Sequence, residues 1–257
     1  MIDKFVVSES KLLARIISYK SKGVIPIIDY AVEHNKNKYS FEEKYRRLLL
    51  ENPNNFHAIK LSGLDYSPLI ANSLVEKAKE HDCKILIDAE EVAVQTRINS
   101  LTNELIMRDH SHIFKTYQMY RKDALDVLQD DISLFRILGN TLNIKLVRGA
   151  YLYKDRSTGQ LAKNKEEVDN NYNDTIRMLM ENQDKIGEII FATHNVKSFS
   201  MIKDIDNKKC YHASLMGFEK QFLKKGCIQK MVYIPFGPYH ETYPYLIRRL
   251  YDNPFIL

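Results

Sequence analysis

The 257-residue sequence contains no tryptophan and only three cysteines, nine glycines and seven prolines. Cys83, Cys210 and Cys227 form no CxxC pair and no zinc-type spacing, so we expect free thiols in a reducing compartment. The scarcity of glycine and proline argues for long regular elements and against a turn-dense β-sandwich. No apolar run approaches the roughly 20 residues that a membrane-spanning helix needs.

Targeting signals are also missing from the start of the sequence. Residues 1–5, MIDKF, show neither the basic and apolar pattern of a signal peptide nor the Arg- and Ser-rich composition of a transit peptide. The excess of 38 Lys and Arg over 33 Asp and Glu is spread along the chain, which indicates a solvated surface rather than a nucleic-acid-binding face. We therefore expect a soluble, intracellular, cytoplasmic protein without a nucleic-acid partner, for which peripheral membrane contact stays open.

Short apolar, β-branched runs alternate with amphipathic stretches along the whole sequence. The runs predict strands over residues 24–29, 58–61, 84–88, 113–117, 144–148, 188–193, 211–215 and 231–235. Helical periodicity predicts helices over residues 41–50, 69–80, 91–107, 118–138, 166–181, 196–205, 218–225 and 242–251. Strands that are separated by helices in this way pair most naturally in parallel.

Eight strand–helix pairs in a chain of this length predict an α/β fold of the (β/α)₈, TIM-barrel type, formed by residues 1–257 as a single domain. A helix over residues 8–19 precedes the first strand and is expected to cap the floor of the barrel. The alternative is a doubly wound open sheet, but no GxGxxG or GxxxxGK(S/T) motif follows any predicted strand.

Polar residues gather where the predicted strands end, which in a barrel is the face that carries catalytic groups. They are Asp29, Glu33, Lys60, Asp88, Lys115, Lys145, Arg148, Thr193, His194, Asn195, Ser214 and Tyr233. A lysine such as Lys60, between Ile59 and Leu61, is costly to bury without a partner, and Asp29 and Asp88 are available across the mouth. Strand ends are more exposed to solvent than strand middles, and this explains one or two polar residues. It does not explain polar residues at the ends of all eight strands, so we predict a functional site there.

The last predicted helix places Tyr245, Arg248, Arg249 and Asp252 on one face, because their spacing is i, i+3, i+4 and i+7. Two adjacent arginines can bind a carboxylate or a phosphate. Taken alone, the pattern favours a surface ion-pair stripe in which Asp252 neutralises Arg248.

Two other patterns have competing interpretations. His110 and His112 flank Ser111, but no carboxylate or cysteine stands at a matching spacing, so we interpret them as a surface loop and predict no metal site. Lys60 and Lys145 can each be a Schiff-base lysine or a cation that binds an anion, and the sequence leaves this choice open.

Five short segments stand at predicted strand or helix positions. They are IDAEE (residues 87–91), YQMY (117–120), KLVRGAY (145–151), ATHN (192–195) and YLIRRL (245–250). In this combination and order, the chain from about Asp29 to Asn253 resembles the proline dehydrogenase family, which comprises flavin-dependent (β/α)₈ enzymes of proline catabolism.

The resemblance implies roles for the substrate-facing residues. Arg248 and Arg249 match the pair that binds the substrate carboxylate, with Lys60 as a third cation. Asp252 stands where the family usually has a glutamate that pairs with an arginine. Aspartate is one methylene shorter than glutamate. The resemblance further implies that three tyrosines line the ring pocket, that one aspartate organises the site and that two acids gate the arginines. These residues are Tyr151, Tyr233 and Tyr245, then Asp88, then Asp29 and Glu33.

The resemblance also implies an FAD cofactor. Lys145 would lie against the flavin near N5, and Lys115 falls where a glutamine or asparagine usually meets the edge of the flavin. The other cofactor-binding residues that it implies are Val147, Gly149, Ala150, Thr193, His194 and Asn195. The polar loop over residues 154–164 is the expected place for the phosphates.

The function that the resemblance implies is oxidation of L-proline to 1-pyrroline-5-carboxylate, with the electrons passed to a quinone-like acceptor. No side chain can accept the hydride that this reaction removes, whereas a flavin can. Ala213 and Ser214 depart from the family pattern, which keeps open hydroxyproline or another secondary amino acid as the substrate. A lyase or aldolase acting through Lys60 or Lys145, and a non-catalytic relative that binds an anion or a protein, remain as further alternatives.

Overall fold

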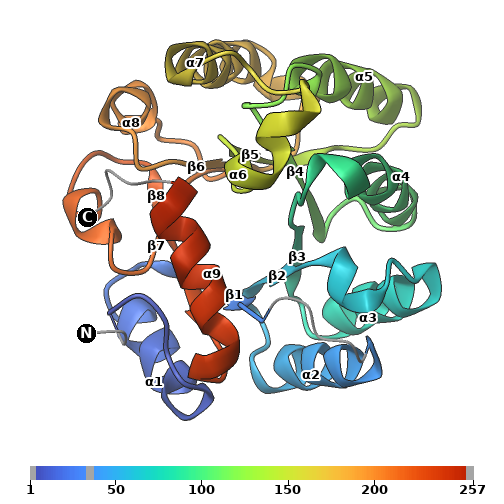
Figure 1. Ribbon diagram of the computed structural model, residues 1–257, viewed down its shortest axis with the longest axis vertical. Helices are drawn as coiled ribbons and strands as arrows, with labels where there is room; N and C mark the ends of the chain where they lie inside the picture. Colours follow the sequence, from blue (N-terminus) through green and yellow to red (C-terminus); the bar gives the residue numbers. More distant parts are fainter. Residues whose placement is uncertain (1–3, 33–37, 253–257) are drawn as a thin grey trace.

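The computed structural model describes residues 4–32 and 38–252; the side chains of residues 38, 244 and 248–252 lie outside this description. In the described part, eight parallel strands form a closed barrel in the order of the sequence, and Figure 1 shows helices arranged around it. The strands are β1 (Ile25–Tyr30), β2 (Phe56–Ile59), β3 (Lys84–Ile87), β4 (Ile113–Gln118), β5 (Asn143–Val147), β6 (Ile189–Ala192), β7 (Cys210–Leu215) and β8 (Gln229–Phe236). The predicted barrel and its strand order are confirmed.

The alternation of each strand divides the apolar core into two parts, because successive side chains point to opposite faces. Ile27, Ala58, Leu86, Phe114, Ile190, Ala213 and Met231 belong to the cluster that fills the barrel. A larger cluster, which includes Ile28, Ile85 and Ile144, lies between the strands and the helices. The same parity points Asp29, Lys60, Asp88 and Lys145 inward at the carboxyl ends of their strands.

Helices follow the strands in turn and cover the outside of the barrel (Figure 1). They are α2 (Lys38–Glu51), α3 (Pro68–Glu80), α4 (Val92–Arg108), α5 (Ala124–Ile137), α7 (Lys165–Glu181) and α8 (Val196–Ile202). The predicted helix over residues 118–138 starts later than expected, because β4 runs to Gln118 and a turn precedes Ala124. A short helix, α6 (Leu152–Asp155), follows β5. No helix in the described ranges is long and apolar enough to cross a membrane.

The leading helix α1 (Glu9–Lys20) lies in the outer ring beside β1 and β8, and not under the floor as predicted (Figure 1). Val7 bonds to β8 on one side of this helix, where its N–H donates to the carbonyl of Pro235 at 3.0 Å. On the other side, the Tyr19 hydroxyl donates to the buried Glu219 carboxylate at 3.0 Å. This helix covers the part of the ring that the helix after β8 leaves open.

The predicted helix over residues 218–225 is wrong. The chain there makes only a single 3₁₀ turn, η5 (Glu219–Gln221). That turn suffices to bury Phe222, whose ring centroid lies 4.8 Å from Phe199 and 4.9 Å from His212. Gly226 then reverses the chain at φ 72°, where an added Cβ would come within 2.0 Å of the Lys203 carbonyl oxygen. This segment therefore buries Phe222 through a single turn, where the sequence predicted a full helix.

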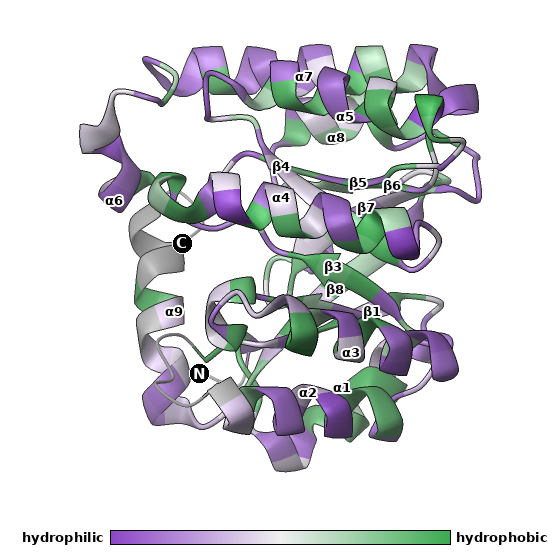
Figure 2. Ribbon diagram, turned by 90° about the vertical axis from the view of Figure 1, so that its right-hand side faces the viewer, coloured by the Kyte–Doolittle hydropathy of each residue, from purple (hydrophilic) through white to green (hydrophobic). Residues whose placement is uncertain are grey.

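The last helix, α9 (Tyr239–Asp252), leaves the ring and crosses one end of the barrel, beside α6 (Figures 1 and 2). This is the carboxyl end of the strands, because α9 starts three residues after β8 and its buried Tyr245 lies beside Lys60, which follows β2. The helix thus covers the mouth at which the polar strand ends meet.

Candidate active site

Four buried charges meet inside the mouth of the barrel. Asp88 lies between two lysines: its Oδ1 is 2.5 Å from Lys145 Nζ, and its Oδ2 is 3.6 Å from Lys60 Nζ. Lys60 Nζ also donates to Asp29 Oδ1 at 2.9 Å. Each of these residues is at most 8% exposed. The sequence-based expectation that Asp29 and Asp88 compensate Lys60 is therefore confirmed.

Two tyrosines flank these lysines. Lys145 Nζ hydrogen-bonds to the hydroxyl of Tyr233, and that hydroxyl donates to Asp88 Oδ1 at 3.3 Å. The ring centroid of Tyr233 lies 4.7 Å from Lys145 Nζ, and that of Tyr245 lies 5.9 Å from Lys60 Nζ. The mouth therefore presents two ammonium groups next to two aromatic faces.

The two lysines differ in their electrostatics. Burial lowers the pKa of Lys60, but the carboxylates of Asp29 and Asp88 outweigh it and hold the pKa well above its ordinary value. For Lys145, burial dominates over Asp88, so its pKa is lowered. The pKa of Tyr233 is raised well above its ordinary value by burial and then by Asp88. Lys60 is therefore a permanent cation, and Tyr233 remains a neutral hydroxyl at neutral pH.

Several predicted residues cannot be placed. Glu33 lies outside the described residues, and so do the side chains of Arg248, Arg249 and Asp252. The backbone of these last three residues belongs to α9, the helix that crosses the mouth. Their predicted role in binding a carboxylate stays a prediction.

Lys115 does not lie where the sequence analysis put it. Its Nζ donates to Asn103 Oδ1 at 2.7 Å and to Asp131 Oδ2 at 2.5 Å, in the layer between β4 and helices α4 and α5. The Tyr117 hydroxyl donates to the same Asp131 oxygen at 2.7 Å. Because Phe114 points into the barrel, the alternation of β4 turns Lys115 outward. The expected contact with the flavin edge is therefore wrong.

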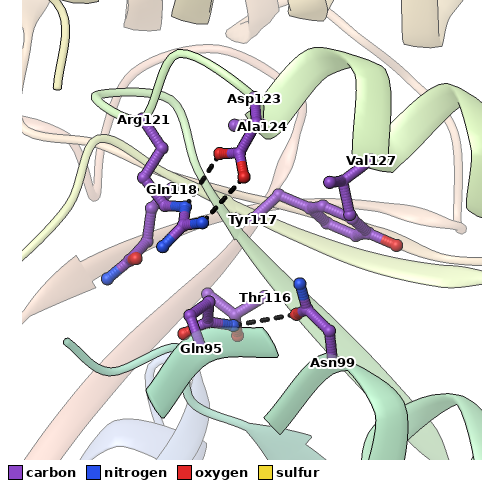
Figure 3. Close-up of a pocket in the computed structure, with 9 residues that line it drawn as sticks. All are labelled: Gln95, Asn99, Thr116, Tyr117, Gln118, Arg121, Asp123, Ala124 and Val127. Atoms are coloured by element: carbon purple, nitrogen blue, oxygen red, sulfur yellow. Dashed lines mark hydrogen bonds and ion pairs between the residues drawn. The ribbon is translucent and has the colours of Figure 1, made fainter. Parts of the chain in front are cut away.

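Gln118 has the inward parity on β4, although the sequence analysis assigned it no role. It is 2% exposed, and its Oε1 accepts no hydrogen bond from the described residues. It lines a small pocket between α4 and the turn that leads to α5 (Figure 3). Once the structure shows that Phe114 points inward, counting in steps of two along β4 selects Gln118 and not Lys115.

The segment after β5 is held tightly. Gly149 has φ 140°, and an added Cβ would come within 1.9 Å of the Tyr120 ring, so only glycine fits. The Tyr120 hydroxyl donates to Asp155 in α6 at 2.5 Å. Val147, by alternation, points inward beside Gln118, with which it pairs across β4 and β5. Ala150 and the buried Tyr151 follow, so the predicted cofactor segment forms a fixed edge of the mouth.

The segment after β6 is also held by internal hydrogen bonds. The Thr193 hydroxyl accepts from Arg148 Nη1 at 2.6 Å and from the Asn195 N–H at 3.0 Å. Asn195 caps α8 by accepting from the Ser198 N–H at 3.1 Å. His194 Nε2 accepts from the Leu215 N–H at 2.9 Å. These bonds shape the β6–α8 loop, and the predicted contact of Thr193, His194 and Asn195 with a cofactor stays a prediction.

The two histidines that the sequence analysis interpreted as a surface loop, His110 and His112, each have a local partner. His112 Nδ1 lies 3.0 Å from Asp109 Oδ2, and His110 Nδ1 lies 3.0 Å from the Thr141 hydroxyl. The described residues contain no group of three or more His, Cys, Asp or Glu that could hold a metal ion. Cys83 and Cys210 are buried free thiols, and Cys227 is an exposed one.

Curated proteins are similar to this chain over most of its length. Proline dehydrogenase 1, mitochondrial, of Caenorhabditis elegans is 27% identical over 209 residues, which cover 72% of this chain and 34% of that protein. Hydroxyproline dehydrogenase of Rattus norvegicus is 29% identical over 210 residues, which cover 72% of this chain and 46% of that protein. The chain thus spans between about a third and a half of the length of these curated relatives.

A solved structure shares the fold. Proline utilization A (PutA) from Bdellovibrio bacteriovorus superposes with a TM-score of 0.82 at 18% identity, over 97% of this chain and 32% of that one. The family model described as proline dehydrogenase matches residues 12–255, which include every strand of the barrel and the helix across its mouth. The chain therefore belongs to the proline dehydrogenase family.

Proposed function

We propose that this protein oxidises L-proline to 1-pyrroline-5-carboxylate, with FAD as cofactor and a quinone-like acceptor for the electrons, and that residues 1–257 act as one domain. The observation that carries the proposal is the buried cluster in which Asp88 holds Lys60 and Lys145 beside the rings of Tyr233 and Tyr245. Cations next to aromatic faces suit a small ring that bears a carboxylate. Membership of the family supports the same reaction.

The substrate carboxylate binds to Lys60, whose charge is secured by Asp29 and Asp88. Arg248 and Arg249, carried across the mouth by α9, add the second and third cations. Asp252 pairs with one of these arginines, and Glu33 acts with Asp29 as a gating acid. This arrangement fixes the orientation of the amino acid before any bond is broken.

The substrate ring packs against tyrosines from three elements: Tyr151 at the start of α6, Tyr233 in β8 and Tyr245 in α9. All three are at most 7% exposed. A ring that fills this space displaces water from the mouth, and charge interactions there become stronger in the resulting low dielectric.

The residues present fit a flavin. The buried Oε1 of Gln118, which accepts no hydrogen bond from the described residues, is suited to accept one from the amide-like edge of the isoalloxazine. Lys145 stands next to it in the barrel and supplies a cation, and Val147, Gly149 and Ala150 form the edge beside it. Thr193, His194 and Asn195 contribute from the next strand, and the loop over residues 154–164 holds the phosphates.

FAD, when bound, supplies the acceptor for the hydride that leaves the substrate. The task of the chain is positional: Lys60 and the arginine pair hold the carboxylate, and the tyrosines hold the ring. Lys145 keeps a positive charge beside the cofactor site, where Asp88 and the Tyr233 hydroxyl fix its Nζ. That charge favours any negative charge that develops there during reduction.

A second substrate, hydroxyproline, is favoured by one observation. Ala213 points into the barrel and is only 1% exposed, so a small side chain stands where a larger one would restrict the pocket. Ser214 lies on the opposite face of β7 and contributes nothing to this space. Comparing kcat/KM for L-proline and for hydroxyproline decides between the two substrates.

Two other functions have less support. A lyase or aldolase needs a neutral lysine as nucleophile, whereas Lys60 and Lys145 are both ion-paired. Trapping of an imine by borohydride with a carbonyl substrate would reveal such an enzyme. A non-catalytic relative would bind flavin or an anion but would never transfer electrons from an amino acid.

The test is anaerobic addition of L-proline to FAD-loaded protein while the visible spectrum is recorded. We expect the flavin absorption near 450 nm to bleach, as for any flavin that accepts a hydride. D-proline serves as the control, because it places the same ring in the opposite handedness. A protein that takes up no FAD, or whose flavin stays oxidised with every secondary amino acid, would disprove the proposal.

A further inference from the structure

Asp155 has a buried carboxylate that the proposed function does not use. It is the last residue of the short helix α6, which lies beside α9 at the carboxyl end of the barrel, and it is 2% exposed. Its Oδ1 accepts from the Val92 N–H at the start of α4 at 3.0 Å, and its Oδ2 accepts from the Tyr120 hydroxyl at 2.5 Å. One side chain therefore joins α6 to α4 and to the turn after β4.

These two hydrogen bonds matter because other contacts hold α6 only weakly. Its four residues are too few to form a stable helix by themselves. Leu152 is 40% exposed and Tyr153 is 87% exposed, so these side chains bury little apolar surface. Lys154 forms an ion pair with Glu91, but both side chains are partly exposed, and pairs of this kind contribute little. The position of α6 therefore depends mainly on Asp155.

Tyr120, the partner of Asp155 after β4, is itself fixed. It is 4% exposed, and its ring packs so closely on Gly149 that an added Cβ would come within 1.9 Å of it. Its N–H donates to the Arg148 carbonyl at 2.8 Å, and its carbonyl accepts from the Ala162 N–H at 2.8 Å. Burial and then the hydrogen bond to Asp155 raise the pKa of Tyr120 well above its ordinary value, so its hydroxyl remains a donor at neutral pH. Asp155 is therefore anchored to a rigidly held group.

The residue that α6 places in the mouth is Tyr151. It precedes the first turn of α6, is 6% exposed, and its carbonyl accepts from the Asp155 N–H at 2.9 Å. Burial lowers the pKa of Lys60, and the Tyr151 hydroxyl acts against burial in the same direction as the two carboxylates described above. That hydroxyl therefore lies near the Lys60 ammonium group. A shift of α6 would move one wall of the proposed ring pocket.

We propose that Asp155 is a positioning residue for the substrate: by joining α6 to α4 and to Tyr120, it keeps Tyr151 against the ring of the bound amino acid. This inference rests on the proposed function and extends it to a side chain outside the ring of polar strand ends. Because a displaced wall weakens binding of the ring in the ground state and in the transition state alike, loss of Asp155 raises KM more than it lowers kcat.

The test is steady-state kinetics with L-proline on the full chain with FAD bound. Asp155→Asn keeps the size of the side chain but can accept only one of the two hydrogen bonds. Tyr120→Phe and the control Tyr117→Phe each delete a buried hydroxyl that donates to a buried aspartate, but the partner of Tyr117 is Asp131 in the outer layer. We expect KM to rise about tenfold in Asp155→Asn and about threefold in Tyr120→Phe, with a smaller change in kcat, and to stay the same in Tyr117→Phe.

Two further measurements separate positioning from folding. In the double variant Asp155→Asn/Tyr120→Phe, KM should rise by less than the product of the two single effects, because the two changes share one hydrogen bond. Hydrogen–deuterium exchange, measured without substrate, should become faster at the amides of residues 151–155 in both single variants. Tyr117→Phe should leave the exchange of these amides unchanged.

Three results would overturn the inference. If L-proline reduces the flavin of the original protein but KM is unchanged in Asp155→Asn and Tyr120→Phe, Asp155 has only a structural role, and the proposed function stands. If Tyr117→Phe raises KM as much as Tyr120→Phe does, the effect comes from lost stability and not from the position of α6. If L-proline never reduces the flavin of the original protein, the inference fails together with the proposed function.

Discussion

Lys145 and Lys115 lie on neighbouring strands, and each has an aspartate and a tyrosine hydroxyl close by. The two lysines nevertheless lie in different regions of the molecule. Lys145 contacts Asp88 at 2.5 Å, with the Tyr233 hydroxyl alongside. Lys115 contacts Asp131 at 2.5 Å, with the Tyr117 hydroxyl alongside. Burial lowers the pKa of both lysines. The first set faces the mouth of the barrel, and the second faces the helices.

The difference shows that a buried lysine–aspartate–tyrosine set does not by itself identify an active site. In the outer layer, Asn103 completes the coordination of Lys115, and helices α4 and α5 cover the set. In the mouth, Asp88 is shared between two lysines, and helix α9 crosses above them. The place of each set in the fold, toward the mouth or toward the helices, separates the two regions rather than the chemistry of the side chains.

The largest expected effect is that of Asp88→Asn, which removes the charge that holds both Lys60 and Lys145. Without that charge the two lysines lose their fixed positions, and a misplacement of about 1 Å can cost roughly 10²-fold in rate, so we expect kcat/KM for L-proline to fall by roughly 10²-fold or more. Steady-state kinetics on FAD-loaded protein measures this. A variant that folds normally and retains near-normal turnover would remove the mouth from the mechanism.

The matching change in the outer layer is Asp131→Ala. It leaves Lys115 buried without its carboxylate, so we expect the free energy of unfolding to fall by about 3 kcal/mol. Turnover per folded molecule should not change. Urea unfolding and kinetics on the same sample check both statements, with Asp130→Ala as the control, because Asp130 is the exposed neighbour in the same helix. A selective loss of turnover would show that the two regions are coupled.

Acid should lower the free energy of unfolding through two buried histidines in the layer between the strands and the helices. Burial lowers the pKa of His57 and of His212 to about 4, and both lie between strands and helices. The unfolded chain therefore binds more protons between pH 6.5 and 4, so stability falls as the pH falls through this window. Each histidine should contribute about 2 kcal/mol of this loss between pH 7 and pH 5. Urea unfolding at several pH values measures it, and His57→Asn should flatten the curve.

The smallest expected effects come from a matched pair of hydroxyl deletions. Tyr233→Phe removes the hydroxyl that contacts Lys145 and Asp88, and should lower kcat/KM about tenfold. Tyr117→Phe removes the hydroxyl that contacts Asp131, and should cost about 1 kcal/mol of stability without changing kcat/KM. Equal kinetic effects in the two variants would contradict the distinction between the regions.

Much of the fold could be predicted because its signals are local. Alternation over four to eight residues predicts each strand, and their number and order predict a barrel. The predictions were wrong where the structure of a segment depends on contacts with residues far away in the sequence. The helix expected over residues 218–225 is reduced to one turn by the packing of Phe222, and α1 joins the ring because α9 leaves it for the mouth.

The candidate site was predictable in part for the same reason. Lys60, between apolar neighbours, required acidic partners, and Asp29 and Asp88 provide them. Lys115 was misplaced because its neighbours in sequence do not show which face of β4 points inward. Gln118 became a candidate only once its burial revealed an acceptor oxygen without a partner among the described residues.

By itself, the order of the residues determined the eight strands, the polar character of their carboxyl ends and the family to which the chain belongs, since these depend on patterns within short segments. Closure of the barrel decided which side chains face one another. Lys145 and Asp88 are 57 positions apart, and only a closed sheet brings their atoms to 2.5 Å. The parity of one strand then separates a lysine of the mouth from a lysine of the outer layer.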